Sequence, residues 1–176
     1  MKRFNLTAAG LAAAAICGAA SADISIQFNS GALGAGGVFG PIAVGSVSGT
    51  LTSFLADITF TNLFGDSSWA SDMLVAFSDG TNAASAGGFN LNFGVTTLGG
   101  WNSGASSASG NYSMMAANGT SVAMNGLGNL YIANGYSASS GASYSGKITL
   151  KGLNYVPAPG AIALLGLAGL RSRRRR

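Results

Sequence analysis

Hydrophobic and polar residues alternate in short runs along most of the chain from Asp23 to Tyr155. In residues 24–28 every second residue is Ile or Phe, and in residues 89–95 four apolar residues alternate with Asn and Gly. Alternation with a period of two predicts β-strands that bury one face. Residues 73–77 are instead apolar without interruption. This run predicts a central strand that is covered on both faces.

Further strands are predicted where similar runs are bounded by Gly, Ser, Asn or Asp. They are residues 47–55, 58–61, 112–115, 121–124, 130–133 and 144–153, with a break between the first two at or beside Asp57. Residues 29–40 and 101–111 are rich in Gly, Ala and Ser, which bury too little apolar surface to offset the ordering of the backbone. They are predicted to be exposed, mobile loops. The whole pattern predicts an all-β body, a β-sandwich of jelly-roll type with roughly eight to ten short strands.

The charged residues divide the chain into a body and two ends. Only Lys147 and Lys151 of the nine basic residues lie in residues 23–155, whereas all five Asp residues lie there. With two Lys against five Asp, the body carries a net charge of −3. The high isoelectric point therefore comes from the ends. Nucleic-acid binding would require Lys and Arg gathered on a folded face, so no nucleic-acid partner is expected.

Residues 1–22 have the three parts of a secretory signal peptide. Lys2 and Arg3 form the basic start, residues 6–16 are apolar, and Ala20 and Ala22 are the small residues of a small-x-small cleavage site. We expect export through the Sec translocon and cleavage by signal peptidase after Ala22. Because Cys17 is the only cysteine, the cleaved body would contain no thiol or disulfide.

Residues 156–176 contain a hinge, an apolar segment and a basic end. They comprise Val156, Pro157, Ala158 and Pro159, then Ala161, Ile162, Ala163, Leu164, Leu165, Gly166, Leu167, Ala168, Gly169 and Leu170, and finally Arg171, Arg173, Arg174, Arg175 and Arg176. The prolines favour an extended hinge. A helix over residues 160–170 would be about 16 Å long, roughly half of a hydrocarbon core of ~30 Å. The arginines should stay on the cytoplasmic side, which would leave the body outside.

This tail resembles the PEP-CTERM sorting signal of Gram-negative and related bacteria. Pro157 and Pro159 match the family's two prolines, residues 161–170 match its apolar stretch, and the terminal arginines match its basic end. Ala158 stands where the family usually has a glutamate. The resemblance implies processing by an exosortase at the inner membrane, followed by release to the cell surface or the extracellular matrix. A plain C-terminal membrane anchor that is never processed is the alternative.

The composition of the body offers little for catalysis. Residues 23–155 contain no His, Glu, Arg or Cys, which removes the usual general bases, the Cys nucleophile and the commonest zinc ligands. A glycosidase-like pair of Asp residues is conceivable, but no spacing specifies one. The body is therefore expected not to be an enzyme and to need no cofactor.

Two other binding chemistries are weaker alternatives. Asp66, Asp72 and Asp79 lie close together in the sequence and could bind Ca²⁺ through carboxylate oxygens. The competing interpretation is that they begin turns or cap strands. Likewise, the Trp and Tyr residues of the body could stack on sugars or could pack in the core.

Taken together, the sequence predicts an exported structural protein of the bacterial surface, extracellular matrix or biofilm, processed by an exosortase and without catalytic activity. An exopolysaccharide is a further candidate partner. The alternative is a secreted β-sandwich module that binds carbohydrate or calcium.

Overall fold

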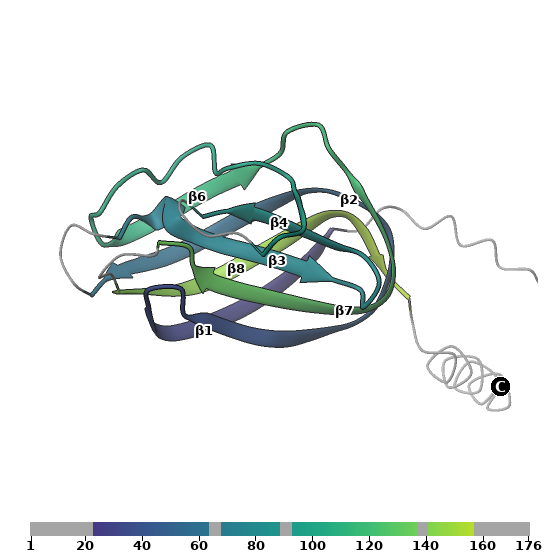
Figure 1. Cartoon of the computed structure of the whole chain (residues 1–176), viewed down its shortest axis with the longest axis horizontal. Helices are drawn as coiled ribbons and strands as arrows, with labels where there is room; N and C mark the ends of the chain where they lie inside the picture. The colour runs from purple at the N-terminus through teal and green to yellow at the C-terminus, as the bar shows by residue number, and fades with distance from the viewer. Residues whose placement is uncertain (1–22, 64–67, 89–92, 137–140, 157–176) are drawn as a thin grey trace, which may run out of the picture.

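The computed structural model describes residues 23–63, 68–88, 93–136 and 141–156 (Figure 1). Within these ranges the chain is all-β, as predicted, with eight strands and one short 3-10 helix. The elements are β1 (Ile24–Gly34), β2 (Val38–Asn62), η1 (Ala70–Asp72), β3 (Met73–Ser78), β4 (Ala83–Gly87), β5 (Thr96–Thr97), β6 (Gly110–Ala116), β7 (Val122–Asn134) and β8 (Gly141–Tyr155).

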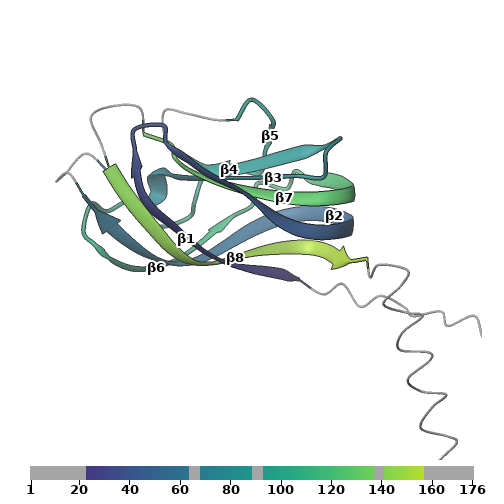
Figure 2. The ribbon, with the colours of Figure 1, turned by 90° about the horizontal axis from the view of Figure 1, so that it is seen from below.

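Strand β2 is at the centre of the sheet and pairs with three other strands, β6, β7 and β8. The strands follow the order β1-β8-β2-β7-β3-β4-β5, and β6 also pairs with β2. The first part of β2 pairs with β7, whereas its second part lies between β8 and β6. Figure 2 shows β3, β4 and β7 on one side of the molecule and β1, β6 and β8 on the other. Because β2 changes partners along its length, it belongs to both groups of strands.

The hydrophobic core joins the two groups of strands. Phe54, Ile58 and Phe60 of β2 are buried in one cluster with side chains of β3, β7 and β8. On β1 the predicted alternation is confirmed, since residues 24, 26 and 28 are buried and the residues between them are exposed. The prediction of a central, covered strand at residues 73–77 is also confirmed, because β3 lies between β7 and β4 and is buried along this run.

Two glycines allow β2 and β8 to approach each other where the register shifts. Gly49 has φ +126° and Gly152 has φ +86°, a backbone region that residues with a side chain rarely adopt. A Cβ atom on Gly49 would lie 2.5 Å from the carbonyl oxygen of Gly152. A Cβ atom on Gly152 would lie 2.2 Å from the carbonyl oxygen of Thr50. The strands can therefore continue past this point only because both positions lack a side chain.

Three sequence predictions about strand limits are wrong. The predicted break at Asp57 is absent, since β2 is continuous and Asp57 points outward, where a charged side chain costs nothing to the core. The predicted strands at residues 121–124 and 130–133 likewise belong to one strand, β7, which runs without a break over Val122–Asn134. Residues 29–40 are mostly in β1 and β2 rather than in a loop. Backbone pairing of β1 with β8 and of β2 with β7 orders them despite their small side chains.

The predicted strand at residues 89–95 is only partly within the described chain. Residues 89–92 lie outside it, and Phe93 and Val95 are half-buried residues outside any strand. The ring of Phe93 lies 6.4 Å from that of Tyr131, centroid to centroid. Its burial therefore comes from contact with an outward-facing residue of β7. The other predicted strands, at residues 112–115 and 144–153, fall within β6 and β8.

The first and last described residues lie at the same end of the body. Ile24, at the start of β1, pairs with Leu150 of the antiparallel strand β8, which continues to Tyr155. Figure 1 shows the start of β1, in purple, and the end of β8, in yellow, toward the same end of the molecule. We call this the exit end, and we call the opposite end, which carries η1, the far end.

Candidate functional site

One outward surface of the body is mostly polar, with the cross-strand pair of Leu55 and Met115 as its apolar exception on β2 and β6. It is formed by alternate residues of β1, β8, the second part of β2, and β6, whose intervening side chains are buried in the core. We call it the polar face. It carries Asp23, Ser25, Gln27, Asn29, Ser53, Asp57, Thr59, Asn111, Ser113, Ser145, Lys147, Thr149 and Lys151. Both lysines of the body are among them.

Cross-strand pairing places these side chains in rows. Asp57 of β2 lies opposite Ser113 of β6 on one side and opposite Lys147 of β8 on the other. The Ser113 hydroxyl donates to Asp57 Oδ1 at 2.6 Å, and Lys147 Nζ lies 3.1 Å from Asp57 Oδ2. The Ser113 hydrogen bond and then Lys147 lower the pKa of Asp57. Asp57 is therefore ionised at neutral pH and acts as a hydrogen-bond acceptor rather than as a general acid.

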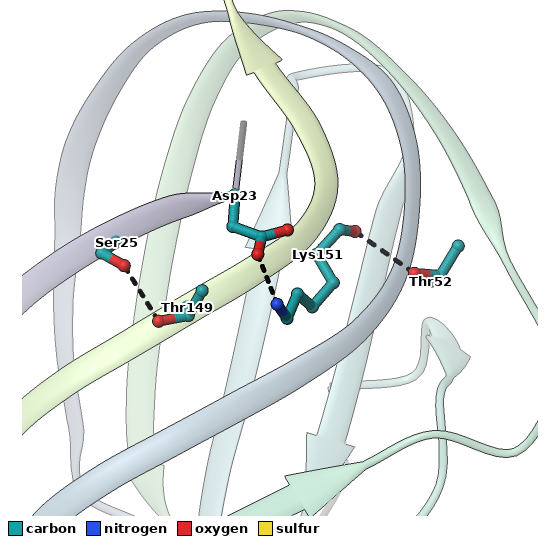
Figure 3. A network of polar contacts seen from close by, with 5 residues as sticks. All are labelled: Asp23, Ser25, Thr52, Thr149 and Lys151. Atoms are coloured by element: carbon teal, nitrogen blue, oxygen red, sulfur yellow. Dashed lines mark hydrogen bonds and ion pairs between the residues drawn. The ribbon is translucent and has the colours of Figure 1, made fainter. Parts of the chain in front are cut away.

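A second polar row lies near the exit end (Figure 3). Lys151 of β8 forms an ion pair with Asp23, the residue before β1. The hydroxyls of Ser25 and Thr149 are 2.9 Å apart, and Thr52 Oγ1 donates to the carbonyl oxygen of Lys151 at 3.4 Å. These contacts attach the first residues of the body to its last strand. Both ion pairs on the polar face are partly exposed, so each contributes only about 0–1 kcal/mol to stability.

A shallow hollow of about 390 Å³ opens on the polar face between β2, β6 and β8. Asp57, Thr59, Asn111, Tyr112 and Ser113 contribute to its lining. Thr59 Oγ1 donates to Asn111 Oδ1 at 2.8 Å, and Tyr112 packs edge-on against the buried ring of Phe60. The hollow thus offers hydroxyl, amide and carboxylate groups held by a rigid sheet. Such groups form hydrogen bonds with polyhydroxylated molecules.

The weak calcium candidates do not come together. Asp66 lies outside the described residues, and Asp72 and Asp79 lie at opposite ends of β3, a six-residue strand about 20 Å long. Asp72 Oδ2 accepts the Trp69 N–H at 2.7 Å, and both carboxylate oxygens of Asp79 accept backbone N–H groups. Among the described residues, no three His, Cys, Asp or Glu side chains are grouped as metal ligands would be. Within the described chain, Asp72 thus accepts the N–H group at the start of η1, and Asp79 accepts N–H groups of the turn that follows β3.

The buried hydroxyl groups of Tyr144 and Ser68 at the far end were not predicted from the sequence. Tyr144 and Ser68 are fully buried, and their hydroxyl oxygens have no hydrogen-bond partner in the part of the chain that the structure describes. Burial, and then the negative charge of Asp72, raise the pKa of Tyr144. The ring of Tyr144 stacks on Phe60 at 5.6 Å. The ring of Tyr144 is thus well packed, while its hydroxyl makes no hydrogen bond within the described residues.

The aromatic side chains mostly pack against the body. Trp101 donates its indole N–H to the carbonyl oxygen of Met73 at 2.6 Å, and Tyr112 donates its hydroxyl to that of Ala108 at 2.6 Å. Trp69 and Tyr155 are exceptions, since they are 45% and 53% exposed. For Trp101, Tyr112 and Tyr144 the core-packing interpretation therefore holds, and the described contacts form no continuous stacking platform.

The predicted sorting residues fall largely outside the described chain. Ala20 and Ala22 of the signal peptide, and Pro157 to Arg176 of the tail, are not among the described residues. Val156 is described, and its N–H donates to the carbonyl oxygen of Ser46 at 2.9 Å. Within the described ranges, no helix has the length and apolar character needed to cross a bilayer.

Comparisons with known proteins give no relative from which to transfer a function. No protein-family model, no curated protein and no solved structure matches this chain. Its function must therefore be argued from its own sequence and geometry.

Proposed function

We propose that this protein is an exported structural component of the bacterial surface or extracellular matrix that is processed by an exosortase. Residues 1–22 would direct it through the Sec translocon to signal peptidase. Residues 156–176 would hold it at the inner membrane until the exosortase acts on the segment containing Pro157 and Pro159. The body would have no catalytic activity of its own.

This proposal rests on the observation that the first and last described residues of the chain both lie at the exit end of the body. Asp23 is ion-paired with Lys151 of β8, and β8 ends four residues later at Tyr155. A leader before Asp23 and an anchor after Val156 can therefore both reach one bilayer while the body projects from it on one side. Ends at opposite poles of the body would make such an arrangement difficult, because the chain would have to return across the whole fold.

We further propose that the body is a β-sandwich of jelly-roll type. The pairing of β2 first with β7 and then with β8 and β6 supports this, since such a strand can pass from one sheet to the other at a bend. The single core cluster shared by both groups of strands supports it as well. A sandwich would present outward surfaces, such as the polar face, to neighbouring matrix molecules.

Processing can be tested by comparing intact masses of the protein from cells with and without the cognate exosortase. The proposal expects loss of the tail only when the enzyme is present. A matched variant, Ala158→Glu, restores the residue that the sorting family usually has and should increase the processed fraction. If the tail persists equally with and without the enzyme in both proteins, the molecule is a plain membrane anchor and the sorting proposal is wrong.

A second candidate function is carbohydrate binding at the hollow of the polar face. It is favoured by the hydroxyl and amide groups of Thr59 and Asn111, which lie beside the ionised Asp57. Calorimetry with soluble polysaccharide fragments tests it. Asn111→Ala should abolish binding, whereas Gln27→Ala, on the polar face but not among the lining residues, should not. Equal heats for both variants would contradict this candidate.

A further inference from the structure

Three exposed apolar side chains surround the point where the chain leaves the body. Leu127 is 66% exposed, Tyr155 is 53% exposed and Val156 is 44% exposed. We call these three residues the exit patch. They are among only seven large hydrophobic residues that are exposed in the described part of the chain.

Backbone pairing brings the exit patch together on either side of β2. Leu127 of β7 pairs with Ser46, and Tyr155 of β8 pairs with Val47. The Val156 N–H donates to the Ser46 carbonyl oxygen, which fixes Val156 beside the same residue. Because Ser46 and Val47 are consecutive and point to opposite faces of β2, the side chains of Leu127 and Tyr155 leave the strands on opposite faces and flank the exit end from both sides.

The sequence around the patch contains no charged residue. Residues 43–49 of β2 and 122–128 of β7 consist only of apolar residues, Gly, Ser and Asn. Charged residues that contact the neighbouring strands are Asp23 and Lys151, which neutralise each other, and Asp79, which is already buried and accepts the N–H of Asn125. Placing this surface against an apolar phase would thus require no isolated charge to lose its water.

Covalent geometry keeps the exit patch near the apolar tail segment. Five residue steps separate Val156 from Ala161, the first residue of that segment. A fully extended chain advances at most about 3.6 Å per residue, so the two are never more than about 18 Å apart. Whenever the tail is in a bilayer, the patch is within reach of the head groups, a region where Tyr side chains are enriched in membrane proteins.

We propose that the exit patch rests on the lipid head-group region while the tail is in the membrane, and that it holds the body with its far end away from the bilayer. This inference rests on the proposed anchoring by residues 161–170. The partner is the bilayer surface itself. Contact with lipid removes Leu127 and Val156 from water and leaves the Tyr155 hydroxyl at the wet boundary, an arrangement that suits an amphipathic ring.

Site-specific fluorescence in vesicles tests the proposal with the full chain. In a Cys17→Ser background, Leu127→Cys and Val38→Cys each give one labelling site on an exposed side chain. Val38 is the matched control, because it begins β2 eight residues before Ser46, about 25 Å away along the strand. An environment-sensitive dye is attached, and the proteins are reconstituted into phosphatidylethanolamine and phosphatidylglycerol vesicles with brominated acyl chains.

The expected result is a blue-shifted emission and strong quenching by bromolipid for the label at position 127, with neither at position 38. If the protein co-sediments with the vesicles but both labels are quenched alike or not at all, the exit patch does not contact lipid and the inference is overturned while anchoring stands. If the protein does not co-sediment, the anchoring proposal fails, and this inference fails with it. A shift at position 127 that requires added exosortase would overturn it in favour of a protein partner.

Discussion

Asp72 and Asp79 flank the same strand, β3, and both are nearly fully buried, yet their pKa values shift in opposite directions. Burial raises the pKa of Asp72, and its single hydrogen bond from the Trp69 N–H opposes this only in part. Burial also raises the pKa of Asp79, but N–H groups of Asn82, Asn125 and Thr81 together outweigh it and lower the pKa.

The difference lies in the number of donors that each carboxylate meets. Asp79 closes the turn between β3 and β4 and also reaches across to β7, so three backbone N–H groups stabilise its charge. Among the described residues Asp72 has one such donor, and it belongs to the far end, where the Tyr144 hydroxyl has no described hydrogen-bond partner. Buried carboxylates of the same type can therefore hold a structure together or be tolerated by it, depending on how many N–H groups point at them.

The largest expected effect comes from removing the Asp79 carboxylate. Asp79→Ala leaves three backbone N–H groups without their acceptor and should lower the free energy of unfolding by about 3–5 kcal/mol, measured by urea denaturation. Asp72→Ala removes one such bond and should cost only about 1–2 kcal/mol. A larger loss for Asp72→Ala than for Asp79→Ala would reverse the comparison.

Crowding the Asp79 turn from the neighbouring strand should have a smaller effect. A Cβ atom on Gly126 of β7 would lie 2.4 Å from the Asp79 carbonyl oxygen, so Gly126→Ala must displace the turn. We expect a loss of about 1–3 kcal/mol in thermal or chemical unfolding. Gly100→Ala is the control, because a Cβ atom there meets nothing within 4 Å and φ is not positive. Equal stabilities of the two variants would show that the turn is not held against β7.

The pH dependence of stability separates the two aspartates further. Because the folded-state pKa of Asp79 is lowered, its contribution is present above the ordinary value of 3.8 and is lost as the pH falls through the folded pKa. Because that of Asp72 is raised, its contribution is present below 3.8 and is lost as the pH rises through the folded pKa.

Denaturation of Asp72→Asn and Asp79→Asn between pH 2.5 and 7, a range of about one to three units on either side of the ordinary Asp value, measures both contributions. At pH 7, Asp79→Asn should have a lower free energy of unfolding than the natural protein. In acid the two free energies should become similar. Asp72→Asn should gain relative stability as the pH rises from acid to neutral. Parallel curves for the two variants would contradict the assignment of opposite shifts.

The smallest expected effect concerns the Tyr144 hydroxyl beside Asp72. Tyr144→Phe removes a buried group that has no partner among the described residues and keeps the ring that stacks on Phe60. The variant should be as stable as the natural protein or more stable by about 1 kcal/mol, as judged by its thermal midpoint. Loss of more than about 1 kcal/mol would show that the hydroxyl is hydrogen-bonded after all.

Sequence pattern predicted those strands in which large apolar residues alternate with polar residues or follow one another without interruption. The alternation at residues 24–28 and the apolar run at 73–77 were sufficient for the first part of β1 and for β3. Strand β4 was missed because Ala83–Gly87 contains only small residues, which are not typical of strands. The continuity of β2 was missed because its polar and Gly residues resemble turns, although pairing with β7, β6 and β8 holds them in the sheet.

The contacts of the polar face could not be predicted from the sequence, and the physical reason differs from that for β2 and β4. Each of its contacts joins residues that are distant in the chain: Asp57 and Ser113 are 56 positions apart, and Asp23 and Lys151 are 128 positions apart. Only the register of β1, β2, β6 and β8 determines which polar residues meet. Proximity in the sequence was likewise a poor guide to proximity in space for Asp72 and Asp79, because a whole strand separates them.

The pairing of β1 with β8 also sets the order of events in folding. The hydroxyls of Ser25 and Thr149 that meet on these strands are 124 residues apart, so the first strand of the body has no partner until nearly the whole chain has been made. Such non-local contacts slow folding. On the export route proposed above, β1 could pair with β8 only after this last strand had emerged from the translocon.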